Sequence, residues 1–406
     1  MRILVATDQW FPDLRGGSAR VATETARGLA RRGHDVTVIA PAAENQPVEA
    51  REGSLTLLRV LSRRALPQTF ADPLGTWRQA RRFVDSPIDL VVAHQVTTAA
   101  GLLGARLGVP LVLVYHASVR RELLFLRGRH PVRWKRLATY PLVPVVAAYE
   151  RIALRAAARV LILSEFTRSL LRADHGEATA ERALRVPGGV DTESFSPGKG
   201  VAAARARLKV EPAAKLLLTV RRLEPRMGLE ELIRAMSLPG VPDDATLTIV
   251  GRGSLERQLD ALARDLGLGP RVRFIGRASD EELSDWYRSA DLFVLPTVAY
   301  EGFGMATAEA LSSGTPVVGT PVGATPELLA PLNDGLIAAD STPPAIAEAI
   351  GRGLALSTPA FREACRDYAV ASFAWERILT TWEEALASVL SAEMGRSVPS
   401  LDHGGP

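Results

Sequence analysis

Residues 300–318 read YEGFGMATAEALSSGTPVV and place Glu301 and Glu309 around a glycine pair. The apolar run before them, LFVLP at 292–296, predicts a strand that ends at a proline, and the alanine-rich run at 305–311 predicts a helix. A glycine loop between a strand and a helix start predicts an anion site, because unpaired backbone N–H groups there face outward with the helix dipole behind them. Carboxylates beside it would accept from hydroxyls, so the segment suits a sugar joined to a phosphate. The plainer alternative is a strand-to-helix turn with two solvated glutamates.

The spacing of Glu301 and Glu309, the EGFG start and the EA…GTPVV finish resemble the signature of the retaining, nucleotide-sugar-dependent glycosyltransferases of family 4. Further segments resemble that family in the same order, among them SEFTR at 164–168 and VPGGVD at 186–191, where Gly188 replaces the usual asparagine. The resemblance runs from Met1 to about residue 390. It implies the GT-B fold, an α/β architecture of two Rossmann-like domains facing each other across a cleft, with a C-terminal helix that crosses back to the first domain.

Two series of apolar runs, separated by helical stretches, independently predict two parallel sheets covered on both faces. The series divide near the PGKG linker at 197–200. We therefore expect an acceptor-side domain over 1–195, a nucleotide-sugar-binding domain over 196–375, a terminal helix over 376–390 and a disordered tail over 391–406. The predicted strands are ILVAT at 3, DVTVIA at 35, DLVVAH at 89, LVLVYH at 111, RVLILS at 159, KLLLTV at 215, TLTIV at 246, RVRFIG at 271 and DLFVLP at 291.

The composition fits a two-domain enzyme of the cytoplasm. At 406 residues, with 47% apolar and 23% charged residues, the chain is long enough for two cores. Its single cysteine, Cys365, rules out an intrachain disulfide and favours a reducing compartment. Asp8 and Asp13 interrupt any apolar signal core near the start, and no apolar run reaches the length of a membrane span.

The net charge of +4 conceals an asymmetry. Residues 1–195 carry 28 Lys and Arg against 18 Asp and Glu, whereas residues 196–406 carry 21 against 27. The excess concentrates at 115–160, where apolar residues are interleaved with ten basic ones. This pattern suggests either a peripheral contact with the anionic inner face of a membrane or a solvated arginine-rich helix face. Nucleic acid is not an expected partner, since no recognition motif is present. The basic residues include Arg120, Arg121, Arg127, Arg129, Arg133, Lys135 and Arg136.

In the first domain, Gly16 and Gly17 follow the first predicted strand and precede a helix expected to begin near Ser18. The family has its Gly-Gly loop here, beside the donor phosphates, although a flexible turn capped by Ser18 is the simpler alternative.

His116 ends the LVLVYH run. The resemblance implies that it contacts the donor sugar near the reacting carbon, while a histidine at a strand end is otherwise an ordinary hydrogen-bonded residue.

The second domain begins with RRLEPRMG at 221–228, where the family usually reads G-R-L-x-x-x-K-G and grips the diphosphate with both the arginine and the lysine. The alignment places Arg222 on the arginine and Met227 on the lysine, with Arg221 in place of the glycine. A cation facing the leaving diphosphate is a large catalytic contribution, so Arg226 or Arg221 would have to supply it. Without such a substitute, the enzyme would be weakened or inactive.

The remaining donor-binding predictions also follow from the resemblance. Glu301 would hold hydroxyls of the donor sugar, and Glu309 those of the ribose. The GxG of IVGRGSLE and the segment around 276 would lie near the nucleotide, although a lone GxG is weak evidence. The predicted catalytic residues are Glu301, His116 and Arg222, and the donor-binding residues are Gly16, Gly17, Arg226, Gly251, Gly276, Arg277, Gly302, Phe303, Gly304, Met305 and Glu309.

The resulting hypothesis is a retaining hexosyltransferase that moves a sugar from a nucleoside diphosphate donor to a lipid-linked or cell-surface glycan precursor. No cofactor or metal is expected, because no D-x-D cluster lies in the phosphate loops. Two alternatives stay open: a non-catalytic sugar-nucleotide-binding relative or partner subunit, which Met227 motivates, and a GT-B-fold sugar-nucleotide epimerase. A Rossmann dehydrogenase is not favoured, since no GxGxxG follows the first strand.

Overall fold

The computed structural model describes residues 1–12, 16–42, 46–60, 68–129 and 142–396. The chain divides into two compact units, which we treat separately. Unit 1 comprises Met1–Leu163, Thr167–Val186 and Ile378–Pro406, and unit 2 comprises Ser164–Phe166 and Pro187–Arg377.

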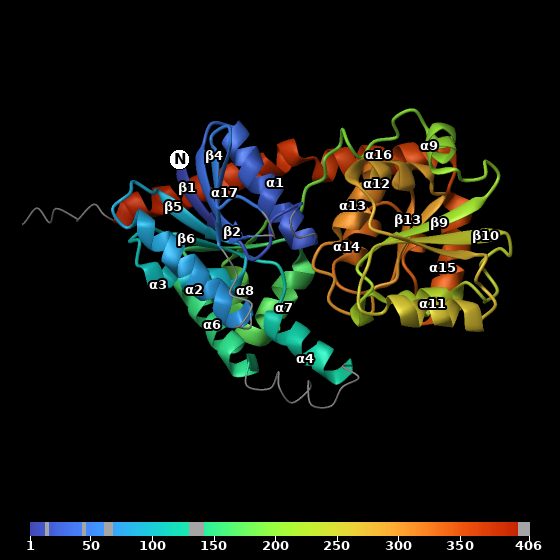
Figure 1. The fold of residues 1–406 in the computed structure, drawn as a ribbon, viewed down its shortest axis with the longest axis horizontal. Coiled ribbons are helices and arrows are strands. Elements are labelled where there is room, and N and C mark those ends of the chain that lie inside the picture. The colour runs from blue at the N-terminus through green and yellow to red at the C-terminus, as the bar shows by residue number, and fades with distance from the viewer. Residues whose placement is uncertain (13–15, 43–45, 61–67, 130–141, 397–406) are drawn as a thin grey trace, which may run out of the picture. The chain divides into compact units, whose positions relative to one another are not determined.

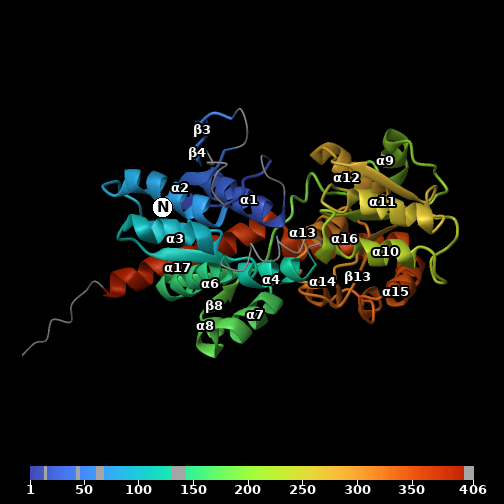
Figure 2. The same cartoon turned by 60° about the horizontal axis from the view of Figure 1, so that its bottom comes forward.

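Unit 1 is built on an eight-stranded sheet with the order β3-β4-β2-β1-β5-β6-β7-β8. Every neighbouring pair is parallel except β3 and β4, which form an antiparallel pair at one edge (Figure 2). The strands are β1 (Arg2–Ala6), β2 (Asp35–Pro41), β3 (Glu49–Glu52), β4 (Leu55–Val60), β5 (Leu90–Ala93), β6 (Leu111–Tyr115), β7 (Arg159–Ile162) and β8 (Ala183–Arg185).

Helices cover both faces of this sheet (Figure 1). Leu4 and Ala6 of β1 belong to a buried cluster with side chains of α3 and α6, while Ile3 and Val5, which point to the opposite face, are buried as well. The all-apolar strands of the sequence therefore reflect burial on two sides. The helices are α1 (Gly17–Arg31), α2 (Gln68–Ala80), η1 (Arg81–Phe83), α3 (Val96–Ala105), α4 (Val119–Arg129), α6 (Leu142–Ala156), α7 (Glu165–His175) and α8 (Glu177–Glu181).

The terminal helix α17 (Trp375–Arg396) packs onto unit 1 from Ile378 onward. Its Leu379 lies directly against Gly28 of α1, where any larger side chain would overlap it. Its Glu383 accepts hydrogen bonds from Arg32, at 2.6 Å, and contacts the His34 ring at 2.8 Å. The helix continues past residue 390, where the tail was expected to begin, because no glycine or proline interrupts it there. Residues 397–406 of the predicted tail lie outside the described residues.

Unit 2 has a five-stranded parallel sheet with the order β11-β10-β9-β12-β13. Two sets of helices cover its faces, α9, α12, α13 and α16 on one side and α10, α11 and α15 on the other (Figure 1). The strands are β9 (Lys215–Val220), β10 (Ala245–Val250), β11 (Val272–Gly276), β12 (Leu292–Leu295) and β13 (Val317–Gly319). The helices are α9 (Val201–Leu208), η2 (Pro225–Met227), α10 (Leu229–Ala235), α11 (Glu256–Asp265), α12 (Asp280–Ser289), α13 (Met305–Ser312), α14 (Thr325–Leu329), η3 (Asp334–Leu336), α15 (Pro343–Leu356) and α16 (Pro359–Phe373).

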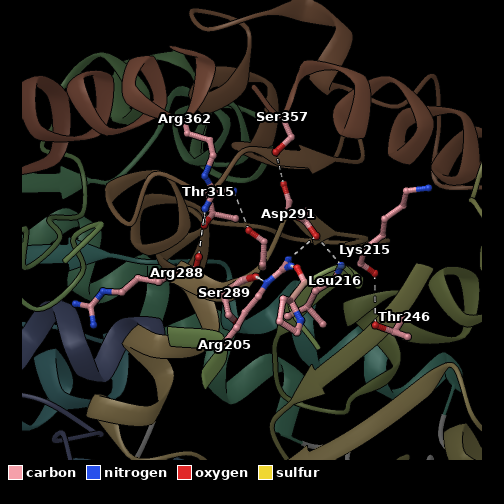
Figure 3. A network of polar contacts seen from close by, with 12 residues as sticks. Arg205, Lys215, Leu216, Thr246, Arg288, Ser289, Asp291, Thr315, Ser357 and Arg362 are labelled. Carbon is pink, nitrogen blue, oxygen red and sulfur yellow. Dashed lines mark hydrogen bonds and ion pairs between the residues drawn. The ribbon is translucent and has the colours of Figure 1, made fainter. Parts of the chain in front are cut away.

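A buried polar network joins the amino-end side of this sheet to its helices (Figure 3). The guanidinium of Arg205 in α9 donates to the carbonyl of Ser289 and pairs with Asp291 at 2.8 Å. Asp291 also accepts from the backbone N–H of Leu216, at the start of β9, at 2.7 Å. Because Arg205 is almost fully buried, these partners compensate for the loss of its hydration.

All nine predicted strands are confirmed, as are the two parallel sheets and the α/β fold class. Four strands were missed, namely β3, β4, β8 and β13. The EARE sequence of β3 has no β-branched residue and lies largely exposed at the sheet edge, so neither propensity nor burial marks it as a strand. The predicted helix at 305–311 is confirmed as α13.

Replacing Gly228 by alanine should test the close approach of two loops in unit 2. Gly228 has φ 72°, and a Cβ there would overlap the carbonyl oxygen of Pro296. Gly267 has φ 70° but no atom near its Cβ position, so Gly267→Ala is a matched control that carries only the left-handed backbone cost of about 1–2 kcal/mol. We expect Gly228→Ala to lower the free energy of unfolding by at least about 3 kcal/mol in urea titrations. Equal effects of the two substitutions would contradict the close approach.

Candidate functional site

The candidate site of unit 2 lies where the parallel strands end, and it includes residues that the sequence did not single out. Arg221 directly follows β9, Gly251 follows β10, and Thr297 follows β12 after a single proline. Backbone hydrogen bonds tie these loops together: Arg221 N–H donates to Val250 at 2.9 Å, and Gly251 N–H donates to Gly276 at 2.7 Å. The carboxyl edge of such a sheet is where ligands of open α/β folds bind.

At the centre of this edge, Glu301 forms an ion pair with Arg221. The Arg221 Nη2 lies 2.6 Å from Glu301 Oε2 and 3.1 Å from the sulfur of Met227. Thr297 connects the pair, since its Oγ1 donates to Glu301 Oε2 at 3.0 Å and accepts from Arg221 Nη1 at 2.7 Å. The pair is well shielded, with side-chain exposures of 7% for Arg221 and 13% for Glu301.

This arrangement keeps Glu301 ionised. Burial by itself would raise the pKa of the carboxyl group, but the charge and hydrogen bond of Arg221, with smaller contributions from Arg226 and Thr297, outweigh it and hold the pKa below its usual value. Glu301 is therefore a hydrogen-bond acceptor only, as a ligand for sugar hydroxyls should be.

Two left-handed residues flank the turn from Glu301 into α13. Gly304, with φ 93°, is the N-cap of α13, and Tyr300 adopts φ 55° although it is not a glycine. Gly302 lies between them and is half-buried. Gly304 adopts this conformation at little cost, whereas the side chain of Tyr300 makes it costlier.

Phe303 and Met305, both predicted donor-binding residues, have buried side chains. The Phe303 ring packs edge-on against Phe373, with 5.5 Å between the centroids. A Cβ on Gly188 would lie 2.7 Å from the Phe303 ring and 2.8 Å from the Met305 sulfur, so the departure from the usual asparagine makes room for these two side chains. The predicted donor contact of Phe303 and Met305 would therefore have to come from their backbone.

Glu309 lies in the interior of α13 and is 6% exposed. The hydroxyl of Tyr287 in α12 donates to its Oε2 at 2.8 Å. Tyr287 is itself fixed by aromatic packing against Phe195 and Phe293. The orientation of Glu309 is thus set by a residue that the sequence did not single out.

Two of the predicted glycines serve loop packing. A Cβ on Gly251, whose φ is 144°, would overlap the carbonyl of Arg221, and a Cβ on Gly253 would overlap that of Leu223. These glycines let the loop after β10 lie on the segment that carries Arg221. Gly276 ends β11 with φ 75°, and the side chain of Arg277 beside it is exposed.

The three arginines of the RRLEPR segment have different positions. Arg221 is buried on Glu301, Arg226 is half-buried and donates to the carbonyl of Tyr300 at 2.9 Å, and Arg222 is exposed. Met227 is buried with its sulfur against the Arg221 guanidinium. Arg221 and Arg226 were the two substitutes considered for the missing lysine. Arg221 contacts Met227, which occupies the lysine position.

In unit 1, the helix α1 begins at Gly17, and its N-cap is Gly16. Ser18, the alternative cap, lies inside the helix and donates to the side chain of Gln9 at 3.2 Å. A helix start built from glycines exposes backbone N–H groups without a competing side chain. This geometry is compatible with the predicted phosphate contact.

His116 directly follows β6, and the ring of His94 lies beside it at the end of the neighbouring strand β5. His94 Nδ1 and His116 Nε2 are 3.2 Å apart. Burial lowers the pKa of His116 to about 4. Burial, together with the charge that His116 would carry, lowers the pKa of His94 well below its usual value. Both rings are therefore neutral at pH 7.

The predicted basic surface is only partly described. Arg120 and Arg121, at the start of α4, both bind the buried carboxylate of Asp174, each at 2.7 Å. These two ion pairs connect α4 to α7, the helix that carries Asp174. The other side chains named for this surface, those of Arg127, Arg129, Arg133, Lys135 and Arg136, lie outside the described residues. No helix in the described parts of the chain has the length and apolar character needed to cross a membrane.

Three residues of these clusters were assigned no role from the sequence: Thr297, Tyr287 and His94. Thr297 and His94 carried a usable signal, since each lies at the end of a predicted strand. Tyr287 carried none, because a tyrosine in an amphipathic helix usually belongs to the core. Among the described residues, no three His, Cys, Asp or Glu side chains are grouped as a metal site.

The neutral state of His116 predicts a pH-dependent stability. Since its folded pKa is about 4 and its unfolded pKa is 6.5, only the unfolded chain gains this proton as the pH falls through that interval. Relative to His116→Phe, the wild-type chain should lose about 2 kcal/mol of unfolding free energy between pH 7 and pH 5. Asp8 and Asp72, whose pKa values are raised by burial to about 7 and about 6, act in the opposite direction, so the difference between the two chains is the quantity to measure. Parallel stability curves would refute the neutral assignment.

Comparison with known proteins supports the same class of enzyme. The family model described as Glycosyltransferase Family 4 matches residues 15–194, and that of Glycosyl transferases group 1 matches residues 202–371. A D-inositol 3-phosphate glycosyltransferase of Geodermatophilus obscurus is 31% identical, over 95% of this chain and 88% of its own. A GDP-mannose-dependent alpha-(1-6)-phosphatidylinositol monomannoside mannosyltransferase of Mycolicibacterium smegmatis is 31% identical, over 87% of this chain and 89% of its own.

Solved structures share the fold. Sucrose-phosphate synthase from Thermosynechococcus elongatus has a TM-score of 0.78 at 22% identity and covers 97% of this chain and 100% of its own. Alr3699/HepE from Anabaena, in complex with UDP-glucose, has a TM-score of 0.74 at 20% identity and covers 96% of this chain and 100% of its own. With the two Rossmann-like units and the matches on both of them, the chain belongs to the family 4 glycosyltransferases of the GT-B fold and is a hexosyltransferase that uses a nucleotide-sugar donor.

Proposed function

We propose that the donor diphosphate binds at the carboxyl edge of the unit 2 sheet, with Arg221 as its principal cation. The observation that carries this proposal is the position of the Arg221 guanidinium, 3.1 Å from the sulfur of Met227 and 2.6 Å from Glu301. The family usually has a lysine at the position of Met227, so Arg221 supplies a positive charge where that lysine would end. An arginine fork also suits phosphate oxygens.

The two glutamates would then orient the sugar and the nucleoside. Among the described residues, Arg221 and Thr297 both contact Oε2 of Glu301, which makes Oε1 the oxygen for a donor hydroxyl. Glu309, held by Tyr287, would accept from the ribose hydroxyls. The start of α13 would add backbone N–H groups and the positive end of the helix dipole.

Unit 1 would supply the remaining predicted contacts. Gly16 and Gly17 would donate backbone N–H groups to the phosphates, and His116 would contact the donor sugar. Arg222 and Arg226 stay predicted donor contacts at the phosphates.

Transfer would retain the anomeric configuration and would need no metal. The acceptor would attack the face of the sugar that the diphosphate leaves, and the departing diphosphate would take the acceptor proton.

For the acceptor, we propose a lipid-linked or cell-surface glycan precursor, with the enzyme on the cytoplasmic side of a membrane. The support comes from relatives, because the two described above are named for an inositol phosphate and a phosphatidylinositol mannoside. The basic composition of residues 115–160 fits peripheral contact with anionic lipid, although Arg120 and Arg121 are engaged with Asp174.

An exchange of residues tests the role of Arg221. Arg221→Gly should lower kcat/KM for the donor by about 100-fold or more, since it removes a cation from a shielded site. The double variant Arg221→Gly/Met227→Lys restores the usual family pattern and should recover at least about 10-fold of that loss. Steady-state release of nucleoside diphosphate, with calorimetric donor binding, provides the measurement.

The matched comparison for this exchange is Arg222→Gly, in the adjacent residue. If Arg222 is the principal phosphate ligand, its replacement should cost more than that of Arg221, and the double variant should show no recovery. That result would transfer the assignment from Arg221 to Arg222.

Replacing Glu301 by alanine should abolish transfer while leaving the fold intact. The carboxylate positions the donor sugar, so we expect kcat to fall by roughly 100-fold or more while the circular dichroism spectrum at the assay temperature stays that of the folded wild type. The melting temperature should fall, because Arg221 loses its shielded partner. Exposed Glu363→Ala in α16 is a surface control that should leave turnover unchanged. Near-normal turnover of Glu301→Ala would remove this glutamate from the site, and donor conversion without an acceptor would favour an epimerase.

A further inference from the structure

His94 lies at the centre of a stack of three rings in unit 1. Its ring is stacked on His116, with 5.4 Å between the centroids and 28° between the planes, and on Trp382 of α17, with 5.9 Å and 18°. His94 is 1% exposed, and its backbone N–H donates to the carbonyl of Ala6 at 2.9 Å. Both the backbone and the ring of His94 are therefore held in place.

The contact between the two histidines couples their protons. His94 Nδ1 and His116 Nε2 are 3.2 Å apart, and neutral rings can form this hydrogen bond only if one nitrogen is protonated and the other is not. If His94 donates, the second nitrogen of His116, Nδ1, carries a proton. If His94 accepts, Nδ1 of His116 is a bare acceptor. The state of His94 thus decides whether His116 presents a donor or an acceptor at Nδ1.

We infer that His94 is a positioning residue for glycosyl transfer, which fixes the ring orientation and the tautomer with which His116 meets the donor sugar. The inference rests on the proposed role of His116. It assigns to the buried histidine at the end of β5 a task that neither core packing nor strand pairing requires, since an apolar ring would fill the same space against Trp382.

Two substitutions separate positioning from packing. His94→Phe keeps a ring for Trp382 but removes the polar contact, whereas His94→Asn places an amide near the position of Nδ1. Histidine-labelled protein would be examined by long-range proton–nitrogen NMR at pH 8, with the His116 signals assigned through His116→Ala. Donor turnover of the same variants would be measured with release of nucleoside diphosphate, and melting temperatures would verify folding.

In the wild-type chain and in His94→Asn, we expect His116 to occupy one tautomer. In His94→Phe, His116 should become a mixture of tautomers, and kcat should fall roughly 10- to 100-fold with little change in the KM for the donor. His94→Asn should retain most of the turnover, which a purely structural role would not produce.

Three results would overturn the inference and leave the proposed role of His116 in place. The first is an unchanged His116 tautomer in His94→Phe, and the second is an equal loss of turnover in His94→Asn and His94→Phe. The third is normal turnover in His94→Phe while His116→Ala is inactive. That result removes the role of His94 but keeps that of His116. A fully active His116→Ala variant would instead remove the proposed role of His116, and the inference with it.

Discussion

The ion pair between Arg221 and Glu301 is the interaction on which the proposed donor site of unit 2 depends. Each charge is removed from water, so each would be costly without the other, and Thr297 completes the hydrogen bonds on both. The pair joins the segment after β9 to the loop after β12. It therefore holds a cation and an anion side by side, which is the combination that a phosphate and a sugar hydroxyl require.

Sheet topology explains why residues distant in the sequence meet at this point. In unit 2 the central strand β9 lies between β10 and β12, so the segments that follow these three strands converge at one edge. Glycines at 228, 251 and 253 allow the converging backbones to pass at distances that no side chain would permit. Unit 1 uses the same principle, because β5 and β6 are neighbours and bring His94 beside His116.

Much of this arrangement was predictable from the sequence, and the failures have physical causes. The nine apolar strands and the EGFG loop before α13 were predictable because they depend on local periodicity and on glycine placement. Which of Arg221, Arg222 and Arg226 pairs with Glu301 was not, since it depends on how the segment after β9 turns its side chains. The partners Tyr287 and His94 depend on which elements pack together, and a single sequence gives no strand order.

The packing of Gly188 beneath the EGFG loop has a consequence for how this enzyme relates to its family. Phe303 and Met305 fill the volume that an asparagine side chain would occupy at that position. Restoring asparagine at position 188 alone would therefore displace the Phe303 ring and the Met305 thioether. Their displacement would in turn shift the backbone that leads from Glu301 into α13. Because Phe303 belongs to the EGFG start that resembles the family signature, a consensus reconstruction that restores asparagine at position 188 has to reposition the Phe303 ring or replace Met305 at the same time.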